Sequence, residues 1–143
     1  MGWDEGRLAR GVIDLFEHLL LLAGRTVDVV ETEYRSLYRD VLGVDAFHVP
    51  VARLRDALGD VTIDGEGLGR DDWLDLLMTH RIQPDFPRDL ITVIYDYPAS
   101  QGALAKIRPV EPPVAERFEA YLGRYVVAHG YHELNDAREQ RAR

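Results

Sequence analysis

Hydrophobic positions in the first part of the chain recur at helical spacing. The segment 4–23 predicts a first helix, because one stripe holds Leu8, Val12, Leu15, Phe16, Leu19 and Leu22. Gly24 follows this helix and is expected to end it, because glycine readily adopts the left-handed conformation found after helix C-termini. A second helix is expected after the capping residue Thr32 and before Gly43, with an apolar face made of Tyr34, Leu37, Tyr38, Val41 and Leu42. A third helix is expected at Val51–Leu58, ended by Gly59.

A fourth helix is predicted after an acidic, glycine-rich connector at 60–69. Asp71 or Asp72 is its expected cap, and its expected buried side chains are Trp73, Leu74, Leu77 and Met78. His80 falls near its end, where an imidazole eases the helix dipole, and a catalytic role is the alternative. The connector lacks the spacing of an EF-hand loop, so we interpret it as a solvated segment rather than a calcium site.

Alternating hydrophobic and polar positions predict strands in the remaining segments. A short edge strand is expected at 25–30, and the run 90–97 is the clearest strand, with Ile91, Val93, Tyr95 and Tyr97 on one face. Its expected antiparallel partner is a single strand at 119–128, entered by a helical turn at 114–118. That strand would stop at His129 and Gly130. Together these elements predict an α+β fold.

Two runs in the second half resemble a known family. The run YLGRYVVAHGYHELNDAREQ is similar to the Y-x-G-G-x-E-L-A-N-G segment and its continuation in elongation factor P lysyltransferases and class II lysyl-tRNA synthetases. The run YDYPASQGALAKI resembles the F/Y-P-A-S-Q-x-x-L-A-x-I segment of the elongation factor P branch. The resemblance implies one partial class II aminoacyl-tRNA synthetase-like catalytic domain over 1–143. It implies an antiparallel sheet with flanking helices and a helical insertion at about 32–82.

The resemblance also implies a reaction and a set of binding residues. Members of this family activate lysine with ATP and magnesium as an adenylate and transfer it to elongation factor P. By resemblance, Tyr131 covers the lysine stem and Glu133 meets the lysine ammonium group. His129 stands where the family has an asparagine that hydrogen-bonds the lysine backbone groups. Val126 and Val127 fall in the ATP and metal segment, and Val126 replaces the metal-binding glutamate.

The replaced residues lead us to expect that this chain alone is inactive. Valine offers no oxygen to magnesium, and the resemblance puts the motif 2 arginine before Met1 and the motif 3 arginine beyond Arg143. We therefore assign no catalytic residue and expect ATP and magnesium to bind weakly or not at all. Three hypotheses remain open: an active lysine ligase, a non-catalytic module that binds a lysine-like molecule, and one subunit of a split synthetase-like protein or of a homo-oligomer.

Composition limits the partners. The formal net charge is −8 and the pI is near 5.0, so transfer RNA is not expected as a direct partner, because phosphate contacts need clustered Lys and Arg. Absent cysteines leave no thiol nucleophile. The most apolar run, 19–23, is too short for a membrane span, so we expect a cytoplasmic protein. The expected partners are a lysine-like small molecule and elongation factor P.

Two further constellations have alternative interpretations. His129, His132 and Glu133 have the donor types of a metal site, but neighbouring residues on an extended segment point apart, so we predict no metal there. Ser100 lacks the G-x-S-x-G context of a nucleophile and is interpreted as a turn hydroxyl.

Overall fold

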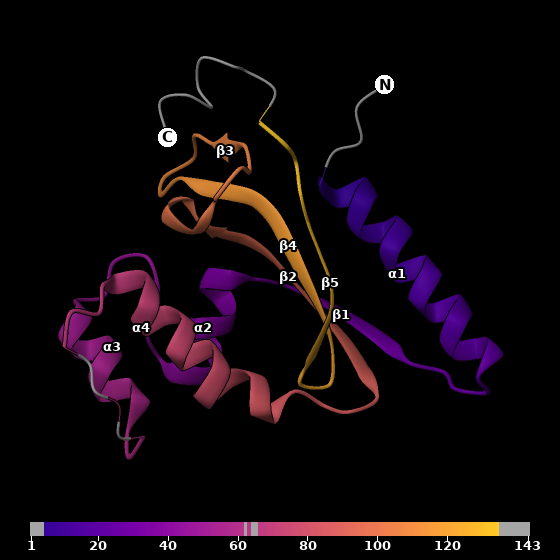
Figure 1. Cartoon of the computed structure of the whole chain (residues 1–143), viewed down its shortest axis with the longest axis horizontal. Coiled ribbons are helices and arrows are strands. Elements are labelled where there is room, and N and C mark those ends of the chain that lie inside the picture. The colour runs from indigo at the N-terminus through magenta and orange to yellow at the C-terminus, as the bar shows by residue number, and fades with distance from the viewer. Residues whose placement is uncertain (1–4, 62, 64–65, 135–143) are drawn as a thin grey trace.

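A mixed sheet lies between helices on both of its faces (Figure 1). The computed structural model describes residues 5–61, 63 and 66–134. Its helices are α1 (Glu5–Leu22), α2 (Tyr34–Leu42), α3 (Val51–Leu58) and α4 (Arg70–Leu77), followed by the short helices η1 (Met78–Ile82), η2 (Gln83–Asp85) and η3 (Ala99–Gln101). Its strands are β1 (Asp28–Glu33), β2 (Leu90–Pro98), β3 (Ile107–Arg108), β4 (Val114–Leu122) and β5 (Tyr125–Tyr131). Within these residues no helix has the length and apolar character that a membrane crossing requires.

The sheet is mixed because its first strand runs parallel to the second. β1 pairs with β2 from Asp28 opposite Leu90 to Glu33 opposite Tyr95. β4 pairs antiparallel with β2 on one side and with β3 and β5 on the other. The α+β prediction is confirmed, whereas the fully antiparallel sheet implied by the resemblance is not what the chain forms.

The greatest difference from the sequence prediction is a hairpin in place of one long strand. β4 starts at Val114, where a helical turn was expected, and ends at Leu122. Gly123 has a φ of 54° and, with Arg124, reverses the chain into β5. A two-residue turn with glycine first is typical of antiparallel hairpins. The predicted alternation over 119–128 was wrong because Gly123 was counted as one more strand position.

The first helix lies on one face of the sheet, and half of the predicted stripe faces the core. Leu8, Val12 and Phe16 pack against it beside the buried Ala9 and Ile13. The other stripe residues, Leu15, Leu19 and Leu22, are 56%, 51% and 81% exposed. The last turns of α1 are apolar on every side, so periodicity did not select the buried face. The core on this side is completed by Ile91, Val93, Phe118 and Ala120.

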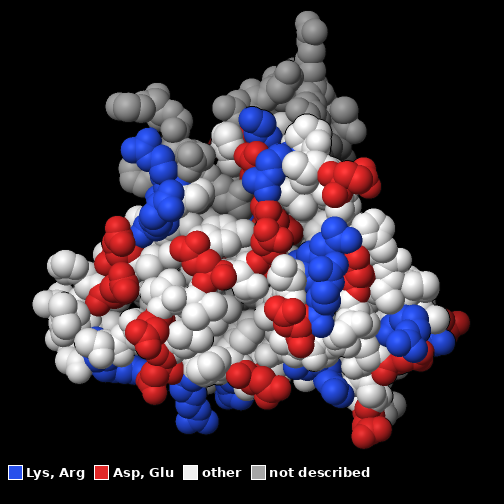
Figure 2. Space-filling model, turned by 180° about the vertical axis from the view of Figure 1, so that it is seen from behind, with Lys and Arg blue, Asp and Glu red and all other residues white. Residues whose placement is uncertain are grey.

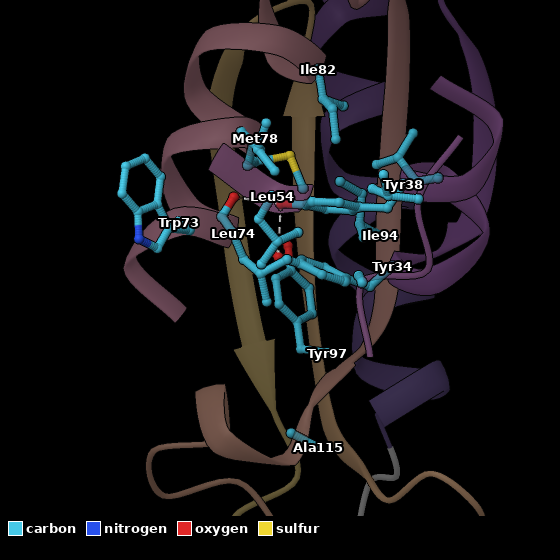
Figure 3. Packing of buried hydrophobic residues seen from close by; sticks show 14 of the residues in the cluster. Tyr34, Tyr38, Leu54, Trp73, Leu74, Met78, Ile82, Ile94, Tyr97 and Ala115 are labelled. Carbon is cyan, nitrogen blue, oxygen red and sulfur yellow. Dashed lines mark hydrogen bonds between the residues drawn. The ribbon is translucent and has the colours of Figure 1, made fainter. Parts of the chain in front are cut away.

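Helices α2 to α4 cover the other face, where the larger core lies (Figure 3). The third helix has the predicted bounds, and Trp73, Leu74, Leu77 and Met78 are buried as predicted. Two caps differ. Thr32 lies in β1 and Glu33 precedes α2, while Gly69 caps α4 by donating its amide to Asp72 at 2.8 Å.

A bulge in β2 turns one aromatic ring to the helical side. The register with β4 shifts between Tyr95 and Tyr97, and Asp96 between them has a φ of 57°. Arg108 donates to the Asp96 carboxylate at 2.5 Å. Tyr95 therefore packs on the α1 side and Tyr97 on the α2 side, although simple alternation predicted one face for both.

Candidate functional site on one face of the sheet

The face of the sheet covered by α4 carries charged side chains of β4. Arg117, Glu119 and Tyr121 alternate along this strand and point to the same side. They line a cavity of about 520 Å³ together with residues of α4, η3 and β2. We call this cavity the acidic pocket and define it by Asp71, Asp75, Tyr97, Arg117, Glu119 and Tyr121.

The only cation lining the acidic pocket, among the described residues, is Arg117, and its guanidinium contacts three groups. It forms an ion pair with Glu119 and donates to the Gln101 carbonyl oxygen at 2.8 Å. It also lies 4.3 Å from the centre of the Tyr97 ring. The second Glu119 oxygen accepts from the Tyr121 hydroxyl at 2.5 Å. This arrangement holds Arg117 and Glu119 together in the pocket and leaves its other carboxylates without an ion pair to any described residue.

Those other carboxylates come from α4. Asp71 accepts a hydrogen bond from the Ser100 hydroxyl at 2.9 Å, and Asp75 accepts one from the Gln101 side chain at 3.0 Å. Desolvation raises the pKa of Asp75, and the charges of Asp71 and Glu119 raise it further. Three carboxylates facing one occupied arginine favour a cationic ligand, because a cation would relieve their mutual repulsion.

The rings of Tyr34, Tyr38 and Tyr97 pack together (Figure 3). Tyr34 and Tyr97 also line the pocket. Tyr34 donates to Tyr38 at 2.8 Å, and Tyr38 donates to the Leu74 carbonyl oxygen at 2.6 Å. The Tyr97 hydroxyl is buried and makes no close hydrogen bond to another described residue, and Tyr97 as a whole is 4% exposed. Burial raises the pKa of all three phenols, so each is a neutral hydroxyl at ordinary pH. An unpaired buried hydroxyl costs stability, and a ligand that pairs with it would recover that cost.

The three residues predicted to bind lysine lie in β5 and just after it, on the face of the sheet that carries the acidic pocket. His129 pairs with Glu119 and Tyr131 pairs with Arg117, so both side chains lie on the pocket side of the sheet. Glu133 continues this alternation and bridges to Ala105. All three residues are exposed, and none lines the acidic pocket itself.

The positions that the resemblance assigns to metal and ATP do not fit those groups. Val126 lines the acidic pocket but brings only methyl groups, and Val127 packs on the α1 side. Glu119 already accepts from Arg117 and Tyr121, and Arg117 has no free face for a phosphate. The described residues therefore supply neither an octahedral oxygen set for magnesium nor a cation for the ATP phosphates on this face.

The histidines do not assemble a metal site. His132 lies on the side of the sheet opposite His129, and its Nδ1 lies 2.6 Å from a Glu116 carboxylate oxygen. His80 is exposed in η1. Across the part of the chain that the structure describes, no three His, Asp or Glu side chains are grouped so as to hold a metal ion.

Sequence reasoning did not find the acidic pocket. Its residues come from α4, β2, η3 and β4, and only folding brings them together. One signal was available, since alternation within β4 places Arg117 and Glu119 on one face. Because 114–118 was predicted to be a helical turn, Arg117 and Glu119 were not placed on one strand face.

Comparison with known proteins supports the predicted resemblance over the whole chain. No protein family model matches. Proteins named elongation factor P--(R)-beta-lysine ligase are similar, with 37% identity over 142 residues in Enterobacter sp. (strain 638) and 36% over 148 residues in Vibrio cholerae. The matches cover 99% and 100% of this chain but 43% and 44% of those relatives. The chain is thus similar along its full length to less than half of an elongation factor P lysine ligase.

Proposed function

We propose that this chain is the lysine-recognising part of an elongation factor P lysine ligase of the lysyl-tRNA synthetase type. Support comes from its similarity, over 99% of its residues, to proteins whose name specifies elongation factor P and (R)-β-lysine. By this proposal the amino acid bound is lysine or (R)-β-lysine, and the acceptor served by the whole ligase is elongation factor P.

The observation that carries the proposal is the charge of the acidic pocket. A lysine-like amino acid has two ammonium groups and one carboxylate at neutral pH, so it is a net cation. Asp71, Asp75 and Glu119 line the pocket with Arg117 as the only counter-charge among the described residues. Charge-assisted hydrogen bonds from ammonium to carboxylate are about twice as strong as neutral ones. One ammonium group enters the pocket and pairs with Asp75.

The exposed residues of β5 then act on the rest of the amino acid. Tyr131 lies against its aliphatic stem and Glu133 pairs with the second ammonium group. His129, on the same face, hydrogen-bonds the carboxylate end. These roles follow from the resemblance, and the shared face is the geometric support for them.

Adenylate formation by the whole ligase joins the lysine carboxylate to the α-phosphorus of ATP and releases pyrophosphate. The acceptor amine then attacks the activated carbonyl and AMP leaves. The described residues contribute binding and orientation of the amino acid, and the acidic pocket offers neither a free cation for the ATP phosphates nor a ligand set for a metal. We therefore propose amino-acid recognition, and not nucleotide activation, as the function of this chain.

Isothermal titration calorimetry with (R)-β-lysine and L-lysine, without ATP, tests the proposal. The wild-type chain should give saturable heat with at least one of them and none with norleucine, which lacks the side-chain ammonium group. Glu133→Gln should weaken binding on the order of tenfold. Glu17→Gln, an exposed site on α1, is the matched control and should leave binding unchanged.

The outcome that refutes the proposal is equal heat with norleucine, or no heat with either lysine. A second assay measures lysine-dependent exchange between ATP and pyrophosphate. We expect no exchange from this chain alone, and exchange would show that it activates the nucleotide as well.

A further inference from the structure

Three arginines converge at the tip of the β4–β5 hairpin. Arg25 follows α1, Arg88 precedes β2, and Arg124 lies in the hairpin turn. They border a cavity of about 420 Å³ whose apolar wall includes Phe86 and Tyr125. We call it the arginine cleft and define it by these five residues.

Backbone contacts hold the cleft in shape. Gly123 donates its amide to the Leu90 carbonyl oxygen at 3.3 Å, and the Gln83 side chain donates to the Arg124 carbonyl oxygen at 2.5 Å. A Cβ at Gly123 would lie 3.2 Å from the Arg88 Cα, and its φ of 54° also favours glycine. The glycine thus lets the turn approach Arg88 closely, which brings two guanidinium-bearing segments together.

The positive charge of the cleft is only partly neutralised. Arg25 pairs with Asp89 at 2.7 Å, an exposed pair of modest strength. Arg124 donates to the Tyr125 hydroxyl at 3.2 Å and lies 5.3 Å from the centre of its ring. Arg88 has no hydrogen bond or ion pair with any described residue. Arg124, followed by Arg88, lowers the pKa of the Tyr125 phenol, as a positive local potential requires.

The negative net charge of the chain favours a small anion over a long one as the ligand of the arginine cleft. The chain carries a formal net charge of −8, so a long polyanion would be repelled by most of its surface. The face in Figure 2 has acidic and basic side chains interspersed, without a continuous basic surface. A small anion that fits within the cleft avoids this repulsion, and the volume is in the range of small-molecule sites.

We propose that the arginine cleft binds a phosphate group, either free or as a phosphate monoester of a small molecule. The guanidinium groups of Arg88 and Arg124 donate to the phosphate oxygens, since the fork geometry of arginine suits them. Tyr125, which is 65% exposed, and Phe86 offer ring faces for a planar group attached to that phosphate. This site is separate from the proposed lysine site.

Titration of ¹⁵N-labelled full chain with inorganic phosphate and with AMP, at low and constant ionic strength, tests the site. Both ligands should shift the amide signals of Arg88 and Arg124 saturably. The double variant Arg88→Gln/Arg124→Gln should weaken binding at least tenfold. Arg10→Gln, an exposed arginine of α1, should change nothing.

The two ligands distinguish the sources of the phosphate. Equal affinities identify an inorganic phosphate site, and tighter AMP binding that Tyr125→Ala reduces to the level of phosphate identifies a monoester site. The proposal is overturned if neither ligand shifts these signals, if the Arg10→Gln variant loses binding equally, or if only an oligoglutamate peptide binds. Because Arg88 and Arg124 are exposed, folding is checked by the unchanged spectrum of the core.

Discussion

The acidic pocket and the arginine cleft meet at the end of β4, yet they treat charge in opposite ways. Tyr121 lines the pocket on one face, and its neighbour Leu122 lines the cleft on the other. In the pocket, Arg117 is engaged from several sides, and Asp71 and Asp75 form no ion pair within the described part of the chain. In the cleft, Arg88 is unpaired among the described residues, no lining residue is acidic, and Asp89 pairs with Arg25.

Comparing the two regions separates the charges that stabilise the fold from those that remain available to bind a ligand. Arg117 and Glu119 are each less than a quarter exposed, with side-chain fractions of 24% and 19%, so they stabilise the sheet through each other. The charges that remain free are negative in one region and positive in the other. The hairpin lies between the two regions, with Glu119 and Tyr121 at the acidic pocket and Arg124 and Tyr125 at the arginine cleft.

The largest expected effect removes the carboxylates of α4. Asp71→Asn/Asp75→Asn keeps the size of both side chains but removes their charge, so binding of (R)-β-lysine should weaken on the order of a hundredfold. Calorimetry measures this loss. Phosphate binding in the arginine cleft should be unchanged in the same variant, and a parallel loss of both ligands would indicate a general folding defect.

The next largest effect is the loss of stability expected when the ion pair between Arg117 and Glu119 is removed. Arg117→Met leaves Glu119 without its cation, and we expect the free energy of unfolding to fall by about 2 kcal/mol, below the value for a fully buried pair. Arg124→Gln, at the exposed tip, should change it by less than about 0.5 kcal/mol. Urea denaturation compares the two variants, and equal effects would contradict the distinction between a structural and a free arginine.

A smaller change concerns the Tyr97 hydroxyl. Tyr97→Phe removes a buried hydroxyl that has no hydrogen-bond partner among the described residues, so the free energy of unfolding should rise by up to about 1 kcal/mol or stay the same. Thermal denaturation gives this value. Lysine affinity should fall severalfold if the hydroxyl pairs with the ligand, and a clear loss of stability would show that the hydroxyl is already satisfied.

The smallest effect is the pH dependence contributed by Asp75. Its pKa is raised in the folded chain, so the folded state holds this proton more tightly than the unfolded state. The contribution of Asp75 to stability therefore falls as pH rises from about 4, the ordinary aspartate pKa, through the raised value. Asp75→Asn removes this falling contribution, so the stability of the variant should fall less, or rise more, with pH than that of the wild type in that window. A variant whose stability falls more steeply with pH than the wild type's would contradict the assigned direction.

Local patterns predicted the helices better than the strands. Val51–Leu58 ends at Gly59 as expected, because its capping and periodic signals are local. The hairpin was missed because Gly123 and Arg124 fit an alternating pattern as well as they fit a turn. The turn becomes evident only from the pairing of Leu122 with Tyr125.

From the sequence, only the candidate residues of β5 and the segment after it could be named in advance. His129, Tyr131 and Glu133 came from the resemblance to one contiguous segment, and their binding roles stay predictions. The acidic pocket joins Asp75 of α4 to Glu119 of β4, and the arginine cleft joins residues as distant as Arg25 and Arg124. Such long-range groupings depend on sheet order and on the bulge at Asp96, which no local pattern encodes.

Chemical-shift mapping with (R)-β-lysine tests the central claim most directly, because it reports where a cationic amino acid binds. Saturable shifts are expected for the amide signals of Asp71, Asp75 and Gln101, with smaller shifts along β5 and none at Arg88. Shifts confined to other regions, or none at saturating amino acid, would contradict the claim.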